Sequence, residues 1–323
     1  MTKKTVFCLI IFINFTVLPY PYEKITVLTG PIGRSSSKGY GGHKAVTRSL
    51  IEGFKKLRVN FNYNPSSIND LGDVVVVLSN IGALKQAFKL RQEGRIKRLL
   101  AGPNLMIRAT DHGRVLDAPH FDMYLVNSDW TWIAYQQDLP SLKNRIDIWP
   151  AGIDPEYWKP IPQKNKNDNK NVLVYVKMQG KSLQKPVEDI LKKYDWNPIS
   201  LVYGKYDHTQ FRQALSKSRF SVFLSRHESQ GLALAESWAM DVPTLPWNIK
   251  FLNAHGRKYN PSSACPFLSN MTGEDWANLE EFEAIIKNIE SKLQNFSPRE
   301  WVLENMTDEA CANILLNIIE SME

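Results

Sequence analysis

The stretch SVFLSRHESQGLALAESWAMDVP, residues 221–243, contains two hydrophobic patterns separated by a polar turn. Residues 221–224 form a short, continuous apolar run, which is typical of a strand buried on both faces of a sheet. After the turn, small and apolar residues continue over 232–240, which is long enough for a helix. The stretch therefore predicts a buried strand, a turn and a helix, the repeating unit of an α/β fold.

The same alternation extends outward from this stretch in both directions. Runs rich in β-branched residues, bounded by glycine, proline or polar residues, alternate with helical segments. Continuous apolar strands of this kind indicate parallel sheets covered by helices on both faces. We expect strands at residues 24–29, 73–78, 98–102, 123–126, 172–176, 199–203, 221–224 and 244–246, and helices at 43–57, 81–93, 211–216 and 232–240.

Residues 160–171, PIPQKNKNDNKN, interrupt the alternation with a polar and charged composition that is typical of a linker. The chain has 323 residues, enough for two domains. The predicted fold class is therefore α/β, with two Rossmann-like, doubly wound domains facing across a cleft. Ligands of such folds bind in the crevice at the carboxyl ends of the strands. We expect domains at 23–155 and 172–300, joined by a linker at 156–171.

Composition excludes several classes of protein. With 43% hydrophobic and 23% charged residues, the chain resembles a globular protein and not a disordered one. Its three cysteines are widely spaced, so a disulfide framework and a zinc site with paired thiolates are both disfavoured. The net charge of +7 suits an anionic ligand, a lipid headgroup surface or nucleic acid, but there is no recognisable nucleic-acid-binding module. We therefore expect no nucleic-acid partner.

The amino terminus carries Lys3 and Lys4 before an apolar run at residues 6–18. This pattern is similar to the start of a signal peptide, but no small-residue cleavage site follows it. The run is also shorter than the ~20 apolar residues that span a bilayer. Residues 1–22 are therefore expected to be a short membrane-touching anchor, an added strand or helix, or a start-site artefact. Localisation is expected to be cytoplasmic, with peripheral membrane contact left open.

Glu228 and Glu236 lie eight positions apart, around the start of the expected helix 232–240. Together with the glycine that follows and the Val-Pro that ends the stretch, they resemble the glutamate-x7-glutamate element of retaining GT-B glycosyltransferases, family 4 in particular. Residues 149–160, WPAGIDPEYWKP, are similar to the segment that joins the two domains of that family. By the same resemblance, residues 301–323 form a helix that packs back across the domains.

The resemblance assigns roles to residues of this element. It implies that Glu236 holds the two ribose hydroxyls of a nucleotide, because a carboxylate can accept both hydrogen bonds, and that Glu228 lies near the transferred sugar. The backbone N–H groups of Ser229, Gln230, Gly231 and Leu232 would bind the diphosphate at the helix start. The plain alternative is that Glu228 is a turn residue and Glu236 a solvated helix residue.

Two further segments would complete a donor site. The resemblance places Lys177 and Lys181 on the diphosphate, with lysine where the family commonly has arginine. Gly41 and Gly42, in KGYGG at residues 38–42, resemble the family's glycine loop, where backbone amides approach phosphate. This loop lacks the G-x-G-x-x-G spacing of dinucleotide-binding folds, which disfavours an NAD site. Solvated lysines and a tight turn without a ligand are the structural alternatives.

The family also places a histidine from its first domain at the reacting sugar. His112, beside Asp111 in ATDHGR, is the best candidate, and His43 and His120 compete with it. A lone histidine is often only structural or exposed.

Together these features predict a retaining hexosyltransferase that uses a nucleotide sugar as co-substrate and a glycan or lipid-linked acceptor. No Asp-x-Asp motif occurs, so we expect no metal ion and no bound cofactor. The alternatives are a nucleotide-sugar epimerase or hydrolase of the same fold, or a non-catalytic binding protein that keeps the fold.

Overall fold

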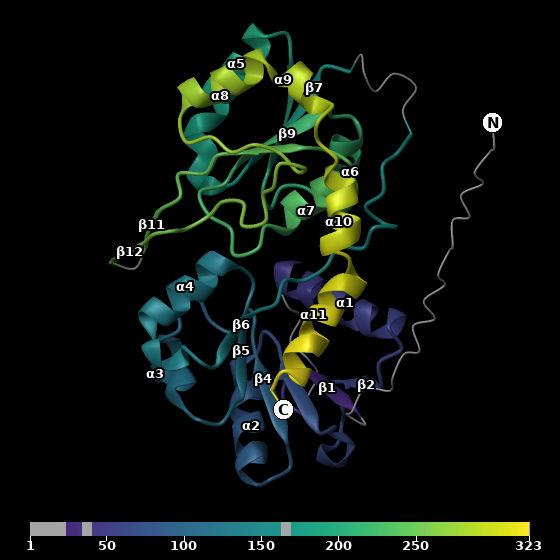
Figure 1. Ribbon diagram of the computed structural model, residues 1–323, viewed down its shortest axis with the longest axis vertical. Coiled ribbons are helices and arrows are strands. Elements are labelled where there is room, and N and C mark those ends of the chain that lie inside the picture. Colours follow the sequence, from purple (N-terminus) through teal and green to yellow (C-terminus); the bar gives the residue numbers. More distant parts are fainter. Residues whose placement is uncertain (1–23, 34–40, 163–168, 255, 323) are drawn as a thin grey trace, which may run out of the picture.

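The computed structural model describes residues 24–33, 41–162, 169–254 and 256–322, and these form two α/β halves stacked along the long axis of the molecule (Figure 1). The first half contains a six-stranded sheet with strand order β2-β1-β3-β4-β5-β6, in which all neighbouring strands are parallel. Its strands are β1 (Ile25–Leu28), β2 (Phe61–Tyr63), β3 (Val74–Val77), β4 (Arg98–Ala101), β5 (Met123–Val126) and β6 (Ile146–Ile148).

The second half contains a four-stranded parallel sheet with strand order β10-β9-β7-β8. A separate antiparallel hairpin of two short strands follows this sheet in the sequence and extends toward the first half (Figure 1). The strands of the second half are β7 (Asn171–Val176), β8 (Asn197–Val202), β9 (Phe220–Leu224), β10 (Thr244–Pro246), β11 (Leu252–Ala254) and β12 (Arg257–Tyr259).

Helices cover both faces of each sheet because successive apolar residues of a strand point to opposite faces. In β3, for example, Val75 and Val77 pack with α2, whereas Val74 and Val76 pack with α1 and α11. In the second half, α5 and α8 cover one face of the sheet, and α6, α7 and α10 cover the other. The helices are α1 (Gly41–Lys56), α2 (Ile81–Gln92), α3 (Asp111–Arg114), α4 (Asp129–Asp138), α5 (Gln184–Lys193), α6 (His208–Ser216), α7 (Leu232–Ala239), α8 (Leu279–Lys287), α9 (Ile289–Leu293), α10 (Pro298–Asn305) and α11 (Asp308–Glu320).

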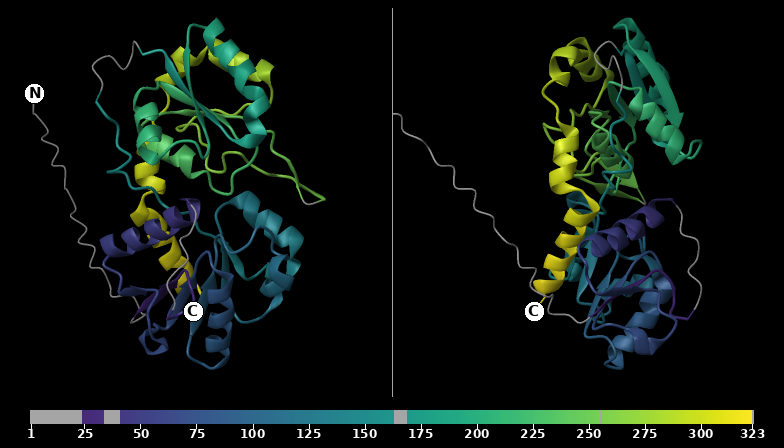
Figure 2. Two further views of the ribbon diagram at one scale, coloured as in Figure 1. Left: turned by 180° about the vertical axis from the view of Figure 1, so that it is seen from behind. Right: turned by 90° about the vertical axis from the view of Figure 1, so that its right-hand side faces the viewer.

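The last two helices run along both halves (Figure 2). Helix α10 packs in the core of the second half, and α11 continues into the first half, where it packs on α1. The approach of α1 and α11 is close at Gly53, where a Cβ atom would lie 2.3 Å from the carbonyl oxygen of Asp308. Trp149 also joins the last helix to the first half, because its indole N–H donates to the carbonyl of Cys311 at 2.9 Å.

The predicted fold class, α/β with two doubly wound parallel sheets, is confirmed by this topology. Each strand and helix expected from the hydrophobic patterns is present to within three residues at either end, and the segment 301–323 contains the end of α10 followed by α11. The sequence reasoning missed the strands β2 and β6, the helices α3, α4, α5, α8 and α9, and the β11–β12 hairpin. Of these, α3, α4 and the hairpin contribute to the site described below. The apolar run at residues 6–18 lies outside the described residues, and among those described no helix is long and apolar enough to cross a membrane.

Candidate functional site

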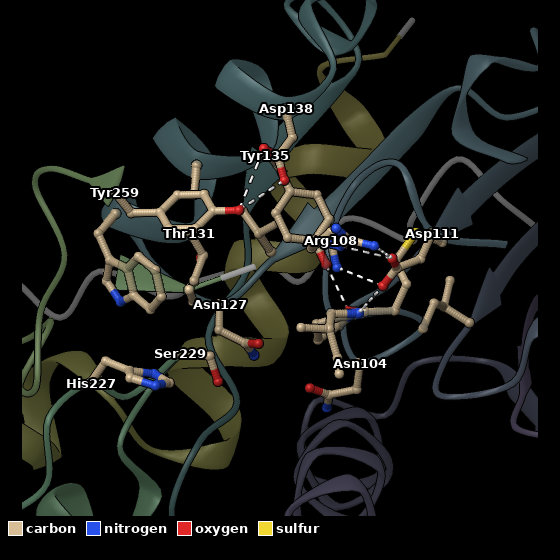
Figure 3. Close-up of a pocket in the computed structure, with 18 of the residues that line it drawn as sticks. Asn104, Arg108, Asp111, Asn127, Thr131, Tyr135, Asp138, His227, Ser229 and Tyr259 are labelled. Atoms are coloured by element: carbon tan, nitrogen blue, oxygen red, sulfur yellow. Dashed lines mark hydrogen bonds and ion pairs between the residues drawn. The ribbon is translucent and has the colours of Figure 1, made fainter. Parts of the chain in front are cut away.

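A pocket of about 870 Å³ lies between the two halves, next to the carboxyl ends of both sheets. The first half contributes His43 at the start of α1, the segment after β4, the end of β5 and one side of α4. The second half contributes Lys177, residues 227–229 and parts of the β11–β12 hairpin. Figure 3 shows these walls, with Tyr135 and Tyr259 on one side and His227 and Ser229 on another. Parallel sheets place ligands at this edge.

An ion pair between Lys177 and Glu228 occupies the side of the pocket formed by the second half. Both carboxylate oxygens of Glu228 are close to Lys177 Nζ, at 2.6 and 2.7 Å, and Ser225 Oγ donates to the carboxylate at 2.6 Å. Strand β7 pairs with β9, so Lys177, directly after β7, and Ser225, directly after β9, leave the sheet side by side. The Lys177 ammonium also lies 4.9 Å from the ring centre of Tyr203. The pair therefore presents one cation and one carboxylate to the pocket.

His112 and His43 both line the pocket on the opposite side from this ion pair, whereas His120 does not. His112 has a left-handed backbone conformation, with φ of 55°, and its side chain is exposed. Its neighbour Asp111 accepts hydrogen bonds from the Arg108 side chain and from two backbone N–H groups, which hold its carboxylate in the charged form. His120 lies against Gln92 and Phe88 instead. His43 and His112 therefore remain candidates for the histidine at the reacting sugar, and His120 does not.

Glu236, on α7, does not line the pocket, but it interacts electrostatically with Arg48 on helix α1 of the first half. Burial raises the pKa of Glu236 to about 8, although the positive charge of Arg48 on α1 opposes this shift. Arg48 itself makes a bidentate pair with Asp308, at 2.8 and 3.1 Å. No described residue donates a hydrogen bond to the Glu236 carboxyl group.

The starts of α1 and α7 supply backbone N–H groups at the crevice. Gly231 has φ of 84°, a left-handed conformation that residues with a side chain rarely adopt, so this turn into α7 favours glycine. The amides of Gly231 and Leu232 donate to no group within the part of the chain that the structure describes. Gly41 and Gly42 begin α1 and have open space around them. Residues 38–40 of the predicted glycine loop lie outside the described residues. Lys181, the second lysine predicted to contact the diphosphate, is exposed and does not line the pocket.

Residues 228–230 also join the two halves. The Gln230 side chain is only 5% exposed, and its amide donates to the carbonyl of Ala151 at 2.5 Å and accepts from the Ala151 N–H at 2.9 Å. Its expected contact with a diphosphate therefore rests on its backbone N–H alone. The carbonyl of Ser229 accepts from Ser128 Oγ, and that of Glu228 accepts from the Trp130 indole N–H. The turn that carries Glu228 is thus attached to the first half.

Some lining residues were not predicted from the sequence. His227, beside Glu228, lines the pocket, and burial and two nearby cations lower its pKa. Trp130 on α4 and Tyr259 on β12 line the pocket as well. Ser128 begins a capping box with Thr131, a local signal that could have revealed α4. Among the described residues, no cluster of three or more histidine, cysteine or acidic side chains could hold a metal ion.

No protein-family model and no curated protein sequence matches the chain. Its fold, however, is shared with solved structures. The apo form of the lipopolysaccharide outer core galactosyltransferase WaaB aligns with a TM-score of 0.58 at 12% identity, covering 93% of this chain and 100% of that one. Anabaena HepE in complex with UDP-glucose aligns at 0.58 with 11% identity, covering 92% and 99%. Sucrose-phosphate synthase from Thermosynechococcus elongatus aligns at 0.58 with 12% identity, covering 93% and 98%.

These structural neighbours are retaining GT-B glycosyltransferases of the family 4 type, the group that the residues around Glu228 and Glu236 resemble. Identities this low establish a common fold and not a common activity. The chain therefore has the GT-B fold, with two Rossmann-like halves facing across the pocket that holds Lys177 and Glu228.

Proposed function

We propose that the chain is a glycosyltransferase that moves a sugar from a nucleoside-diphosphate sugar to an acceptor hydroxyl, with retention of configuration and without a metal ion. The observation that carries this proposal is the convergence of Lys177, Glu228 and His112 on one pocket between the halves of a GT-B fold. A structure of the same fold was solved with UDP-glucose, which supports a nucleotide sugar as the donor. The acceptor is a glycan or a lipid-linked sugar.

The donor diphosphate would lie in the crevice between the starts of α1 and α7. Both helix starts direct backbone N–H groups and the positive end of the helix dipole toward an anion. Lys177 adds a full positive charge near the diphosphate. Lys181, four residues later and exposed at the surface, would add a second positive charge. Glu236 would accept hydrogen bonds from the ribose hydroxyls, because no described side chain occupies its carboxyl group.

The reaction requires stabilisation of separated charge. The bond between the anomeric carbon and the phosphate oxygen breaks, and its electron pair leaves with the diphosphate, where Lys177 and the helix N–H groups stabilise it. The acceptor oxygen forms the new bond to the same face of the anomeric carbon and gives its proton to the departing phosphate oxygen. Glu228 stabilises the positive charge that develops on the sugar, and His112 bonds to a sugar hydroxyl from the opposite wall.

The test is a panel of uridine, adenosine and guanosine diphosphate sugars, incubated with the full chain in the presence of EDTA and simple saccharides. We expect transfer or slow hydrolysis of at least one donor, retention of the anomeric configuration by NMR, and a rate at least roughly 10²-fold lower in Glu228→Gln. Glu280→Gln, an exposed glutamate on α8, is the matched control.

Each alternative function has its own outcome in this experiment. An altered sugar on an intact nucleotide would indicate an epimerase, and release of sugar to water that no saccharide intercepts would indicate a hydrolase. Nucleotide binding without turnover of any donor would indicate a non-catalytic binding protein. Any of these results would contradict the proposed transfer.

A further inference from the structure

One part of the pocket, called the hairpin end below, has a wall from each half of the molecule. Helix α4 supplies the first-half wall, and the β11–β12 hairpin reaches across from the second half to supply the other (Figure 1). Leu252 and Tyr259 of the hairpin pack with Ala134 and Trp130 of α4 in a small hydrophobic cluster. The hairpin is therefore part of the pocket as well as a contact between the halves.

A buried carboxylate fixes the hairpin to α4. Asp138, the last residue of α4, is 8% exposed, and it accepts from Arg257 Nη1 at 2.5 Å and from the Tyr259 hydroxyl at 3.2 Å. A buried carboxylate is stable only when it is paired and hydrogen-bonded, so α4 without the hairpin would leave Asp138 unsatisfied. Figure 3 shows the Tyr259 hydroxyl bonded to Asp138 on α4.

The charged side chains of α4 and of residues 108–111 that line this end already have ion-pair partners. Arg108 is bound to Asp111, at 3.0 Å for both Nε and Nη2, and Asp138 is bound to Arg257. A phosphate or carboxylate bound here would have to break an existing ion pair to gain a permanent cation, so an uncharged ligand fits better.

The remaining lining combines ring faces with hydrogen-bonding groups. Tyr135, Trp130 and Tyr259 supply aromatic surface, and Asn104 and Asn127 line the same pocket (Figure 3). The Asn127 amide donates to Gln230 Oε1 at 3.3 Å. The Asn104 amide has no partner among the described residues. A sugar ring has the same two features, an apolar face of C–H groups and a rim of hydroxyls. A lipid chain would instead leave the Asn104 amide without hydrogen bonds, at a cost in free energy.

We propose that this end of the pocket binds an uncharged sugar ring of the acceptor and that the β11–β12 hairpin is the element that selects it. The proposal rests on the proposed function, because it takes the Lys177 end as the donor site. Tyr259 is the key residue, since its ring faces the pocket and its hydroxyl links the hairpin to Asp138.

The test measures ligand binding and does not depend on turnover. Methyl glucosides, methyl galactosides and cellobiose are compared with glucose 1-phosphate and a short-chain polyprenyl phosphate, by saturation-transfer NMR, with UDP present and absent. The proteins are the wild type, Tyr259→Ala and Tyr259→Phe, with Asn253→Ala on the exposed side of the hairpin as the control. UDP affinity is measured for each by calorimetry, and folding is checked by circular dichroism.

We expect a neutral saccharide to bind the wild type, with saturation strongest on its C–H protons. Binding should weaken at least tenfold in Tyr259→Ala, less in Tyr259→Phe, and not at all in Asn253→Ala, while UDP affinity stays unchanged in all four proteins. Stronger binding of the phosphate compounds, equal saccharide binding in Tyr259→Ala, or binding of neither class would overturn the inference. If UDP fails to bind the wild type, the proposed function fails instead.

Discussion

The ammonium group of Lys177 lies 2.6 Å from the carboxylate of Glu228, although the two residues are 51 positions apart in the sequence. They meet because β7 and β9 are neighbours in a parallel sheet and both chains leave it at the same edge. Lys177 retains 24% and Glu228 14% of its side-chain exposure, so the pair is accessible to a ligand from the pocket. This relationship brings a cation and a carboxylate to the point where the proposed donor would react.

Replacement of Lys177 by alanine should lower donor turnover by about 10²-fold, the usual effect of removing one preorganised group that stabilises developing negative charge. Lys177→Arg should restore part of the rate, because it keeps the positive charge. Lys185→Ala is the matched control, since Lys185 is 82% exposed and pairs with Asp189 on the same helix. Steady-state rates with the best donor of the panel measure the effect, and a loss of less than threefold would argue against a role for Lys177.

Replacement of Gln230 by alanine should destabilise the protein by roughly 2–4 kcal/mol, because the buried N–H and C=O of Ala151 would both lose their partner. Urea unfolding followed by tryptophan fluorescence measures this change. Gln294→Ala provides the comparison, since Gln294 is an exposed residue between α9 and α10 and should change stability by less than about 0.5 kcal/mol. Equal stabilities of the two variants would show that Gln230 does not hold the halves together.

The raised pKa of Glu236 predicts that stability falls with rising pH. In the unfolded chain the carboxyl group ionises near its model value of 4.5, whereas in the folded protein it keeps its proton up to about pH 8. The stabilising contribution is thus fully present below pH 4.5 and is lost as the pH rises through 8, a change on the order of a few kcal/mol. Glu236→Gln should remove this component. Unfolding free energies of both proteins at pH 5 and pH 8.5 measure it, and identical pH dependences would refute the assignment.

Replacement of Gly53 by alanine should destabilise the contact between α1 and α11. The new methyl group would lie 2.3 Å from the Asp308 carbonyl oxygen and 2.6 Å from Ala312 Cβ, so the helices would have to move apart. Overpacking of this kind costs about 1–3 kcal/mol. Thermal unfolding should therefore begin at a lower temperature than in Lys55→Ala, a change on the exposed side of α1. An unchanged melting temperature in Gly53→Ala would mean that α11 is not tightly packed on α1.

Much of the fold could be predicted from the sequence because its central strands are continuous apolar runs. VVVV in β3 and FSVFL in β9 are buried along their whole length, and such runs between polar turns have few other interpretations. The edge strand β2 is only partly buried, with sequence FNY, and a three-residue strand of that composition gives almost no pattern. Helix α4 was missed because aromatic and polar residues are distributed around it without a clear apolar face.

The candidate site was predicted only in part, for reasons of distance along the chain. Residues near the glutamate element could be assigned because they follow one strand and start one helix. The positions of Trp130 and Tyr259 depend on the packing of the two halves, which no local pattern encodes. Gln230 illustrates the same limit: its place in the helix-start segment indicated a ligand contact, but its side chain is bonded to Ala151 in the other half.

The most direct test of the central claim is a calorimetric titration of UDP, in EDTA, into the wild type, Lys177→Ala and Glu236→Ala. We expect binding by the wild type with one site per chain, at least roughly tenfold weaker binding by each variant, and unchanged affinity in the Lys185→Ala control. Absence of UDP binding by the folded wild type, or equal affinities in all four proteins, would contradict a nucleotide-diphosphate site between the two halves.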